Sequence, residues 1–77
     1  MTAVLYSRPG CHLCEAMEEA LSAAGCTAIR VVNIDDSAEL SQRFGLSIPV
    51  AVVDQRYWFV GAVSRAALSS ALARLYD

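Results

Sequence analysis

The residues best suited to covalent chemistry in this chain are Cys11 and Cys14, two cysteines separated by two residues. Thiols at this spacing can close a small disulfide or supply half of a metal site. Tetrahedral zinc would need two further ligands, and the chain offers only His12 and the distant Cys26. Haem attachment is excluded because Glu15, rather than histidine, follows the second cysteine. The pair therefore indicates thiol–disulfide chemistry, with a metal centre shared between two chains as the alternative.

The two cysteines lie where an apolar run gives way to a helical pattern. Residues 3–6 are a short run of β-formers that Pro9-Gly10 stops, which predicts a buried strand. Residues 11–24 predict an amphipathic helix, because small and apolar residues recur at helical spacing at Leu13, Cys14, Met17, Ala20, Leu21 and Ala24. A thiol at a helix start faces unpaired N–H groups and the positive end of the helix dipole, which stabilise a thiolate. We therefore expect Cys11 to be the nucleophile and Cys14, one turn deeper, to resolve the mixed disulfide.

Two neighbours of the cysteine pair, and the third cysteine of the chain, each have more than one interpretation. Arg8 either holds a positive charge near the thiolate, binds a substrate carboxylate or is simply solvated in a polar turn. His12 either favours the thiolate electrostatically or faces solvent without such a role. Cys26 lies about twelve residues, or roughly 18 Å of helix, beyond Cys14, so a bond between them is excluded. It is best explained as a small buried residue before a strand.

The remaining elements must position these thiols. Residues 27–34 predict a second strand, parallel to the first through the helical crossover. A capping pattern predicts a short helix over residues 37–44, and residues 50–53 and 57–60 predict an antiparallel hairpin. Ser64 can cap a final helix with one apolar face, made of Leu68, Ala71, Leu72 and Leu75. The order is βαβαββα, an α/β fold in a single domain spanning residues 1–77.

Composition excludes several classes of function. The 77 residues carry six arginines, no lysine and eight acidic residues, and the arginines are scattered, so no basic face for nucleic acid is expected. The N-terminus has no basic region before an apolar stretch, and no window approaches a membrane span, so no membrane association is expected. Three cysteines are an odd number, which favours the reducing cytoplasm over a secreted disulfide scaffold. We expect a cytoplasmic monomer.

These features together resemble the glutaredoxins of the thioredoxin-fold superfamily, over almost the entire chain. The most similar pattern is that of small bacterial glutaredoxin-like proteins, in which a Tyr-containing strand leads through Arg-Pro into Cys-His-Leu-Cys, as at residues 6–14 here. The resemblance implies a four-stranded mixed sheet flanked by helices, with Cys11 attacking, Cys14 resolving and Arg8 helping to bind glutathione. It also implies a cis Ile48-Pro49 bond facing the cysteines, with the Ile48 backbone pairing with an extended substrate.

The sequence departs from glutaredoxins at two places. His12-Leu13 replaces the usual Pro-Tyr between the cysteines, which changes the substrate surface. Ser64-Arg65 stands where the resemblance places an acidic pair that holds the glutathione amine. We therefore expect Ser64 to belong to the substrate-binding surface, together with Arg8, His12, Leu13, Ile48 and Pro49. Serine can still cap the helix, but arginine repels an amine. A protein disulfide is therefore an alternative substrate to a glutathione mixed disulfide.

The sequence thus predicts a thiol–disulfide oxidoreductase with no tightly bound cofactor and with glutathione as a co-substrate. Its partner would be glutathione or a disulfide-bearing protein. The alternative from another class is a non-catalytic binding module, which docks a partner at the Ile48-Pro49 edge or binds a metal or iron–sulfur centre between chains through Cys11. A third alternative is a structural remnant whose thiols have ordinary reactivity.

Overall fold

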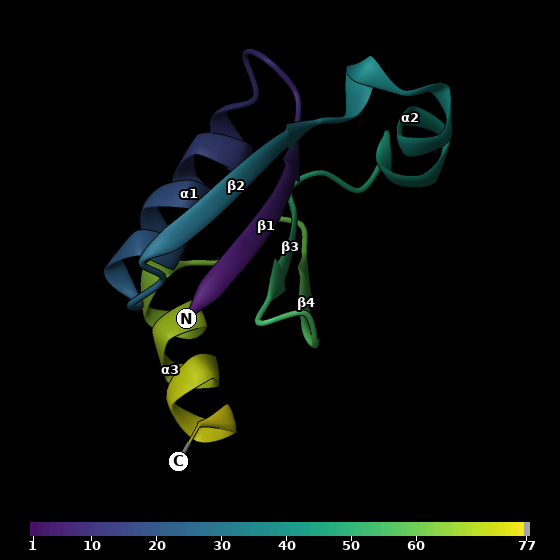
Figure 1. The fold of residues 1–77 in the computed structure, drawn as a ribbon. Helices are drawn as coiled ribbons and strands as arrows, with labels where there is room; N and C mark the ends of the chain where they lie inside the picture. The colour runs from purple at the N-terminus through teal and green to yellow at the C-terminus, as the bar shows by residue number, and fades with distance from the viewer. Residues whose placement is uncertain (77) are drawn as a thin grey trace.

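Four strands form one mixed sheet in the order β2-β1-β3-β4 in the computed structural model, which describes residues 1–76 (Figure 1). The central strand β1 (Thr2–Ser7) pairs in parallel with β2 (Ala28–Asn33) and antiparallel with β3 (Val50–Val53). The edge strand β4 (Tyr57–Val60) pairs antiparallel with β3. The predicted strands and their directions are therefore confirmed, and the fold is an α/β fold of the thioredoxin type.

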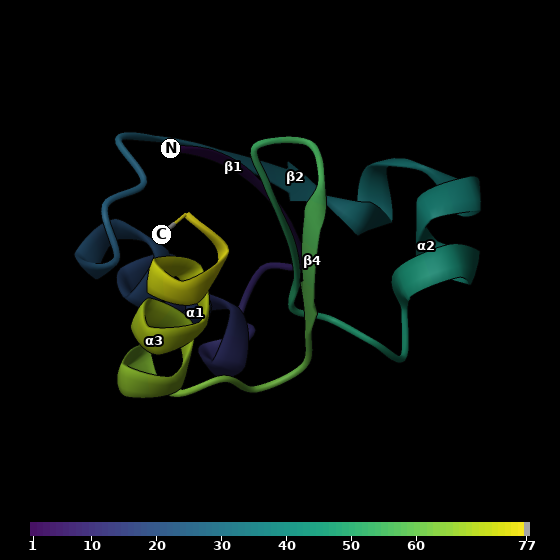
Figure 2. The ribbon, with the colours of Figure 1, turned by 90° about the horizontal axis from the view of Figure 1, so that it is seen from below.

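Two helices cover one face of this sheet, α1 (His12–Ala23) and α3 (Arg65–Leu75), as Figure 2 shows. Side chains alternate along β1, so that Leu5 is buried on this face whereas Tyr6 points to the other. The main core is built from β1, α1, β3 and α3 and consists of Ala3, Leu5, Met17, Ala20, Leu21, Cys26, Ala51, Val53, Leu68 and Leu72.

Two residues assigned to apolar helix faces are about half exposed instead of buried. Leu75 is 44% exposed, because the last turn of α3 runs past the end of the sheet (Figure 1). Leu13 is 54% exposed, since the buried stripe of α1 begins at Cys14 and the preceding residue points about 100° away around the helix. The helical spacing identified the correct stripe but extended it by one residue at each of these ends.

The opposite face of the sheet carries the short helix α2 (Ala38–Phe44) at one end only. Its Phe44 ring stacks on Tyr6 at a centroid distance of 4.6 Å. We call the small cluster around this contact the peripheral cluster; it consists of Ile34, Phe44 and Val50, with Tyr6, Leu40 and Ile48 packed against it. The middle of this face is left as an open groove of about 610 Å³, whose lining includes Val4, Arg30, Val52 and Trp58.

A single 3₁₀ turn, η1 (Ile34–Asp36), precedes α2 and was not predicted. The predicted strand over residues 27–34 is one residue too long at this end, because the Asn33 side chain accepts a hydrogen bond from the Asp35 N–H at 2.9 Å and turns the chain. The predicted helix over residues 37–44 begins one residue later. Ser37 is its cap and accepts from the Leu40 N–H at 3.3 Å.

Asp54, in the β3–β4 turn, ties the two ends of the described chain together. Its carboxylate accepts a hydrogen bond from the Thr2 N–H at 2.8 Å and another from the Tyr76 hydroxyl. The Tyr76 hydroxyl, followed by the Thr2 N–H, lowers the pKa of Asp54 below its usual value. The same bond raises the pKa of Tyr76 to about 12.

We predict that Asp54→Asn makes the protein less stable at neutral pH and flattens its acid sensitivity. A carboxyl whose pKa is lowered on folding contributes stability above its unfolded pKa, and that contribution is lost as the pH falls through the folded value. The melting temperature, measured from pH 7 down to pH 2, should therefore fall less steeply in the variant than in the wild type. The raised pKa of Tyr76 makes a second contribution to stability, which is present below about pH 10 and is lost as the pH rises toward the folded pKa. Tyr76→Phe should remove this contribution. Equal acid slopes for Asp54→Asn and the wild type would contradict this assignment.

Candidate active site

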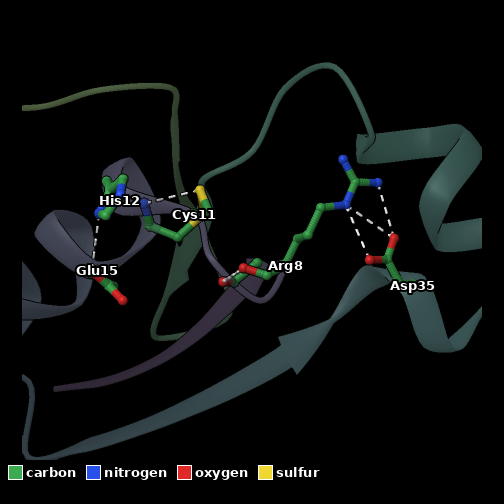
Figure 3. Close-up of a disulfide and its surroundings, with 7 residues drawn as sticks. Arg8, Cys11, His12, Glu15 and Asp35 are labelled. Atoms are coloured by element: carbon green, nitrogen blue, oxygen red, sulfur yellow. Dashed lines mark hydrogen bonds and ion pairs between the residues drawn. A yellow bond between two sulfur atoms is a disulfide. The ribbon is translucent and has the colours of Figure 1, made fainter.

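Cys11 and Cys14 form a disulfide at the start of α1, with their Cα atoms 5.2 Å apart (Figure 3). Cys11 is the N-cap of the helix, and its Sγ accepts a hydrogen bond from the Cys14 N–H at 3.2 Å. Cys11 is partly exposed, whereas Cys14 is buried at 2% exposure. The two cysteines therefore differ in their exposure to solvent, and the sulfur of the more exposed one accepts a backbone hydrogen bond.

The loop before α1 delivers Cys11 to the helix start. Gly10 has a φ of +78°, a left-handed conformation that glycine adopts without strain. The Cys11 N–H donates back to the Arg8 carbonyl at 3.3 Å, and the Cys11 carbonyl accepts from the Glu15 N–H at 3.1 Å as the helix begins. The Arg-Pro-Gly sequence thus makes the turn that separates the strand from the helix.

Arg8 extends from this loop toward η1 and binds Asp35 (Figure 3). Its Nε donates to Oδ1 at 3.0 Å and to Oδ2 at 3.2 Å, and its Nη2 lies 3.0 Å from Oδ1. The guanidinium points away from Cys11 in this view. The positive charge expected near Cys11 is therefore present on the preceding loop, but it is neutralised by Asp35, a residue that the sequence pattern did not indicate.

A pocket of about 230 Å³ lies beside the disulfide and is lined by both cysteines. Its charged lining residues are Arg8, Glu15 and Glu18; the others are Ser7, Pro9, Gly10, Val31 and Asn33. Arg8 is the one cation among the described residues that line the pocket, and it is paired with Asp35. The carboxylates of Glu15 and Glu18 therefore have no cationic partner among the lining residues that the structure describes. The surroundings of the disulfide are thus more acidic than the sequence motif suggested.

His12 and Leu13, the residues between the cysteines, lie on the outer side of the first turn of α1. The His12 side chain is 95% exposed, and its Nδ1 lies 3.6 Å from Glu15 Oε2. Neither residue lines the pocket. They therefore present an imidazole and an aliphatic side chain to whatever approaches the disulfide from solvent.

The Ile48–Pro49 peptide bond is cis, as expected. Val50 pairs with Tyr6, so Pro49 lies at the end of β3 that adjoins the exit of β1 toward Cys11. Its carbonyl accepts from the Gly61 N–H at 2.8 Å. The two expected substrate-binding segments thus meet at one end of the sheet.

Ser64 is the N-cap of α3, and its Oγ accepts from the Ala67 N–H at 3.1 Å. The predicted capping role is confirmed. Contact with a substrate stays a prediction for this residue.

Two functional candidates, Asp35 and Asn33, were missed. The register of the parallel pair β1–β2 sets Ser7 opposite Asn33, so the residues just after each strand meet at the same sheet edge. The predicted parallel pairing of the two strands could therefore have indicated that Arg8 and Asp35 lie close together, because each follows the end of one of these strands.

Cys26 is a free thiol buried in the main core. Burial raises its pKa, which disfavours the reactive thiolate. Within residues 1–76, no group of three or more His, Cys, Asp or Glu side chains is arranged to hold a metal ion. None of the helices in the described part of the chain is long and apolar enough to span a membrane.

A thioredoxin-type sheet with a CxxC disulfide at the start of its first helix defines the class of this protein, the thioredoxin-fold dithiol proteins. Residues 2–73 match the family model described as "Glutaredoxin-like domain (DUF836)", so the chain belongs to this glutaredoxin-like family.

Solved structures similar to this chain include two of protein XcR50 from X. campestris, a structural genomics target. The X-ray structure has a TM-score of 0.83 at 33% identity, over 95% of this chain and 97% of that one. The solution structure has a TM-score of 0.79 at 34% identity, over 96% and 95% respectively. No curated protein matches the chain.

Proposed function

We propose that this protein is a thiol–disulfide oxidoreductase that works through Cys11 and Cys14. The observation that carries the proposal is the asymmetry of the disulfide at the helix start. Cys11 is partly exposed and its sulfur accepts a hydrogen bond from the Cys14 N–H, whereas Cys14 is buried at 2% exposure. An N–H directed at sulfur and the dipole of α1 both favour a thiolate at Cys11.

The reaction proceeds in two exchanges. The Cys11 thiolate attacks one sulfur of the substrate disulfide, which forms a mixed disulfide and expels the other substrate sulfur as a thiolate that takes up a proton. Cys14 then loses its proton and attacks the Cys11 sulfur, which releases the second substrate thiol and closes the Cys11–Cys14 disulfide. The substrate gains two electrons and the protein loses two. A pair of external thiols, such as two glutathione molecules or a reductase dithiol, reduces the protein again in the reducing cytoplasm, where we place the reaction.

The substrate class is a disulfide carried by glutathione or by a protein, and three features favour a protein. Arg8, which would hold a glutathione carboxylate, is paired with Asp35. Arg65, at the start of α3, has the charge that repels the glutathione amine. Leu13 presents an exposed aliphatic side chain beside the disulfide, suited to contact with an apolar peptide residue.

The proposal is tested by equilibrating the protein in glutathione buffers of graded redox poise and analysing acid-quenched samples by intact mass. We expect a Cys11–Cys14 disulfide that titrates reversibly between about −270 and −120 mV, the range of related dithiols. Coupled assays with glutathione and with a thioredoxin-type reductase then identify the reductant. A glutathione adduct on Cys11 would favour the glutathione substrate. A disulfide that neither reductant turns over would refute the proposed activity.

A further inference from the structure

The charge nearest to the cysteines along the loop is the Arg8 guanidinium, and the structure gives it a fixed place. Two guanidinium nitrogens contact the Asp35 carboxylate at 3.0 to 3.2 Å, so the fork geometry of arginine is used rather than a single contact. Asp35 is itself held, because the Asn33 side chain accepts from its N–H at 2.9 Å. The pair thus joins the active-site loop to η1.

This ion pair has little to contribute to folding stability. The side chains are 38% and 46% exposed, and exposed ion pairs add little because solvent screens them. Its main physical effect is on the position of charge. It neutralises the Arg8 cation with a carboxylate and draws it toward η1, on the side away from Cys11 (Figure 3).

We infer that Asp35 is a positioning residue that withholds the Arg8 cation from the Cys11 sulfur and thereby limits the fraction of Cys11 present as thiolate. A cation near a thiol favours the thiolate, and its effect falls as it is moved away or paired with an anion. The inference rests on the proposed function for its significance, since thiolate fraction sets how fast Cys11 attacks a disulfide.

The other charges around the sulfur atoms do not replace Arg8. Glu15 and Glu18 of α1 line the pocket beside the disulfide and disfavour a thiolate. His12 is exposed to solvent and lies against Glu15. No charged residue of β3, β4 or α3 lines this pocket within the described residues, so Arg8 is the cation that can most change the charge at Cys11.

The test is the thiolate absorbance of the fully reduced protein, titrated with pH in the absence of any substrate. Asp35→Asn keeps the size of the side chain and removes its charge. We expect the midpoint of the Cys11 titration to fall by about half a unit, a roughly threefold higher ratio of thiolate to thiol. The longer carboxylate in Asp35→Glu should preserve the pair and restore the wild-type midpoint. Alkylation of Cys11 at a fixed pH below the midpoint should also accelerate, by less than threefold, because a thiolate of lower pKa is a weaker nucleophile.

Two controls separate positioning from a general loss of negative charge. Asp36→Asn removes an equal charge from the next, exposed residue of η1 and should leave the midpoint nearly unchanged. In an Arg8→Gln background, Asp35→Asn should no longer lower the midpoint, because there is no cation to release. An equal shift from Asp36→Asn, or a shift that persists without Arg8, would overturn the inference.

The titration also distinguishes this inference from the proposed activity. A midpoint that responds to Asp35 in a protein without turnover would uphold the positioning role and refute the activity. Turnover by a protein whose Cys11 midpoint is the same with and without the Asp35 charge would support the activity and refute the positioning role. Arg8→Gln alone provides a second test if Asp35→Asn fails to fold. If Asp35 already holds the Arg8 cation away from Cys11, removing that cation should barely change the Cys11 midpoint.

Discussion

Replacing Cys11 with serine is expected to abolish disulfide exchange, with a loss of at least about a hundredfold, because a hydroxyl at neutral pH does not attack a disulfide as a thiolate does. Cys11 is the partly exposed cysteine, and its sulfur accepts from the Cys14 N–H, whereas Cys14 and Cys26 are buried, so we expect no other thiol in the chain to take its place. The measurement is the reduction of an aromatic disulfide whose released thiol absorbs visible light, under single-turnover conditions with pre-reduced protein.

Cys14→Ser should behave differently, because it removes the second exchange but leaves the first. The variant should release one equivalent of thiol and stop as a mixed disulfide on Cys11, visible by intact mass. Cys26→Ala is the matched control, since its thiol is buried in the main core and should not contribute to the reaction. Full activity in Cys11→Ser, or an adduct on Cys14 in the wild type, would reverse the assigned roles.

The second large effect is expected on stability, from Leu68→Ala in α3. Leu68 is fully buried, and it belongs to the core that joins α3 to α1 and the sheet. Removing its side chain forfeits apolar burial and leaves a cavity, at a cost of about 2–5 kcal/mol. A domain of this size buries little surface and is marginally stable, so this loss should leave a substantial unfolded fraction at 37 °C.

Leu75→Ala provides the control on the same helix, with the same change of residue type. Its side chain is 44% exposed, and we expect a change within about 0.5 kcal/mol. Urea unfolding followed by circular dichroism measures both variants. A similar loss for the two would mean that the last turn of α3 is packed in solution, as its helical spacing suggested.

The order and direction of the strands could be predicted because each carries a strong local signal. The two strands of the hairpin span residues 50–53 and 57–60, as expected. The second strand is parallel to the first, as the helix that connects them predicts. Errors fall at element ends. Leu13 and Leu75 fit the helical spacing, but burial there depends on where the sheet ends, which no local pattern records. The turn η1 depends on a single side-chain cap at Asn33.

The site was predictable where it depends on spacing and was missed where it depends on tertiary contact. The positions of Cys11 and Cys14 at the helix start follow from the motif and the helix pattern. The partner of Arg8 lies 27 residues away along the chain and is fixed by the strand register rather than by any motif. A basic residue before a CxxC therefore indicates a charge in the neighbourhood, whereas its electrostatic effect is decided by the carboxylate that it meets.

Because the peripheral cluster is separate from the main core, we expect this small chain to have two cooperative units of unequal stability. The main core joins β1, β3, α1 and α3, whereas η1 and α2 are packed through the three buried side chains of the peripheral cluster, and the exposed Arg8–Asp35 pair adds little stability. Amide hydrogens of α2 should thus exchange through local opening that leaves the sheet intact. We expect such opening to break the ion pair and free Arg8, which would couple Cys11, the proposed nucleophile, to a segment that unfolds without the rest of the molecule.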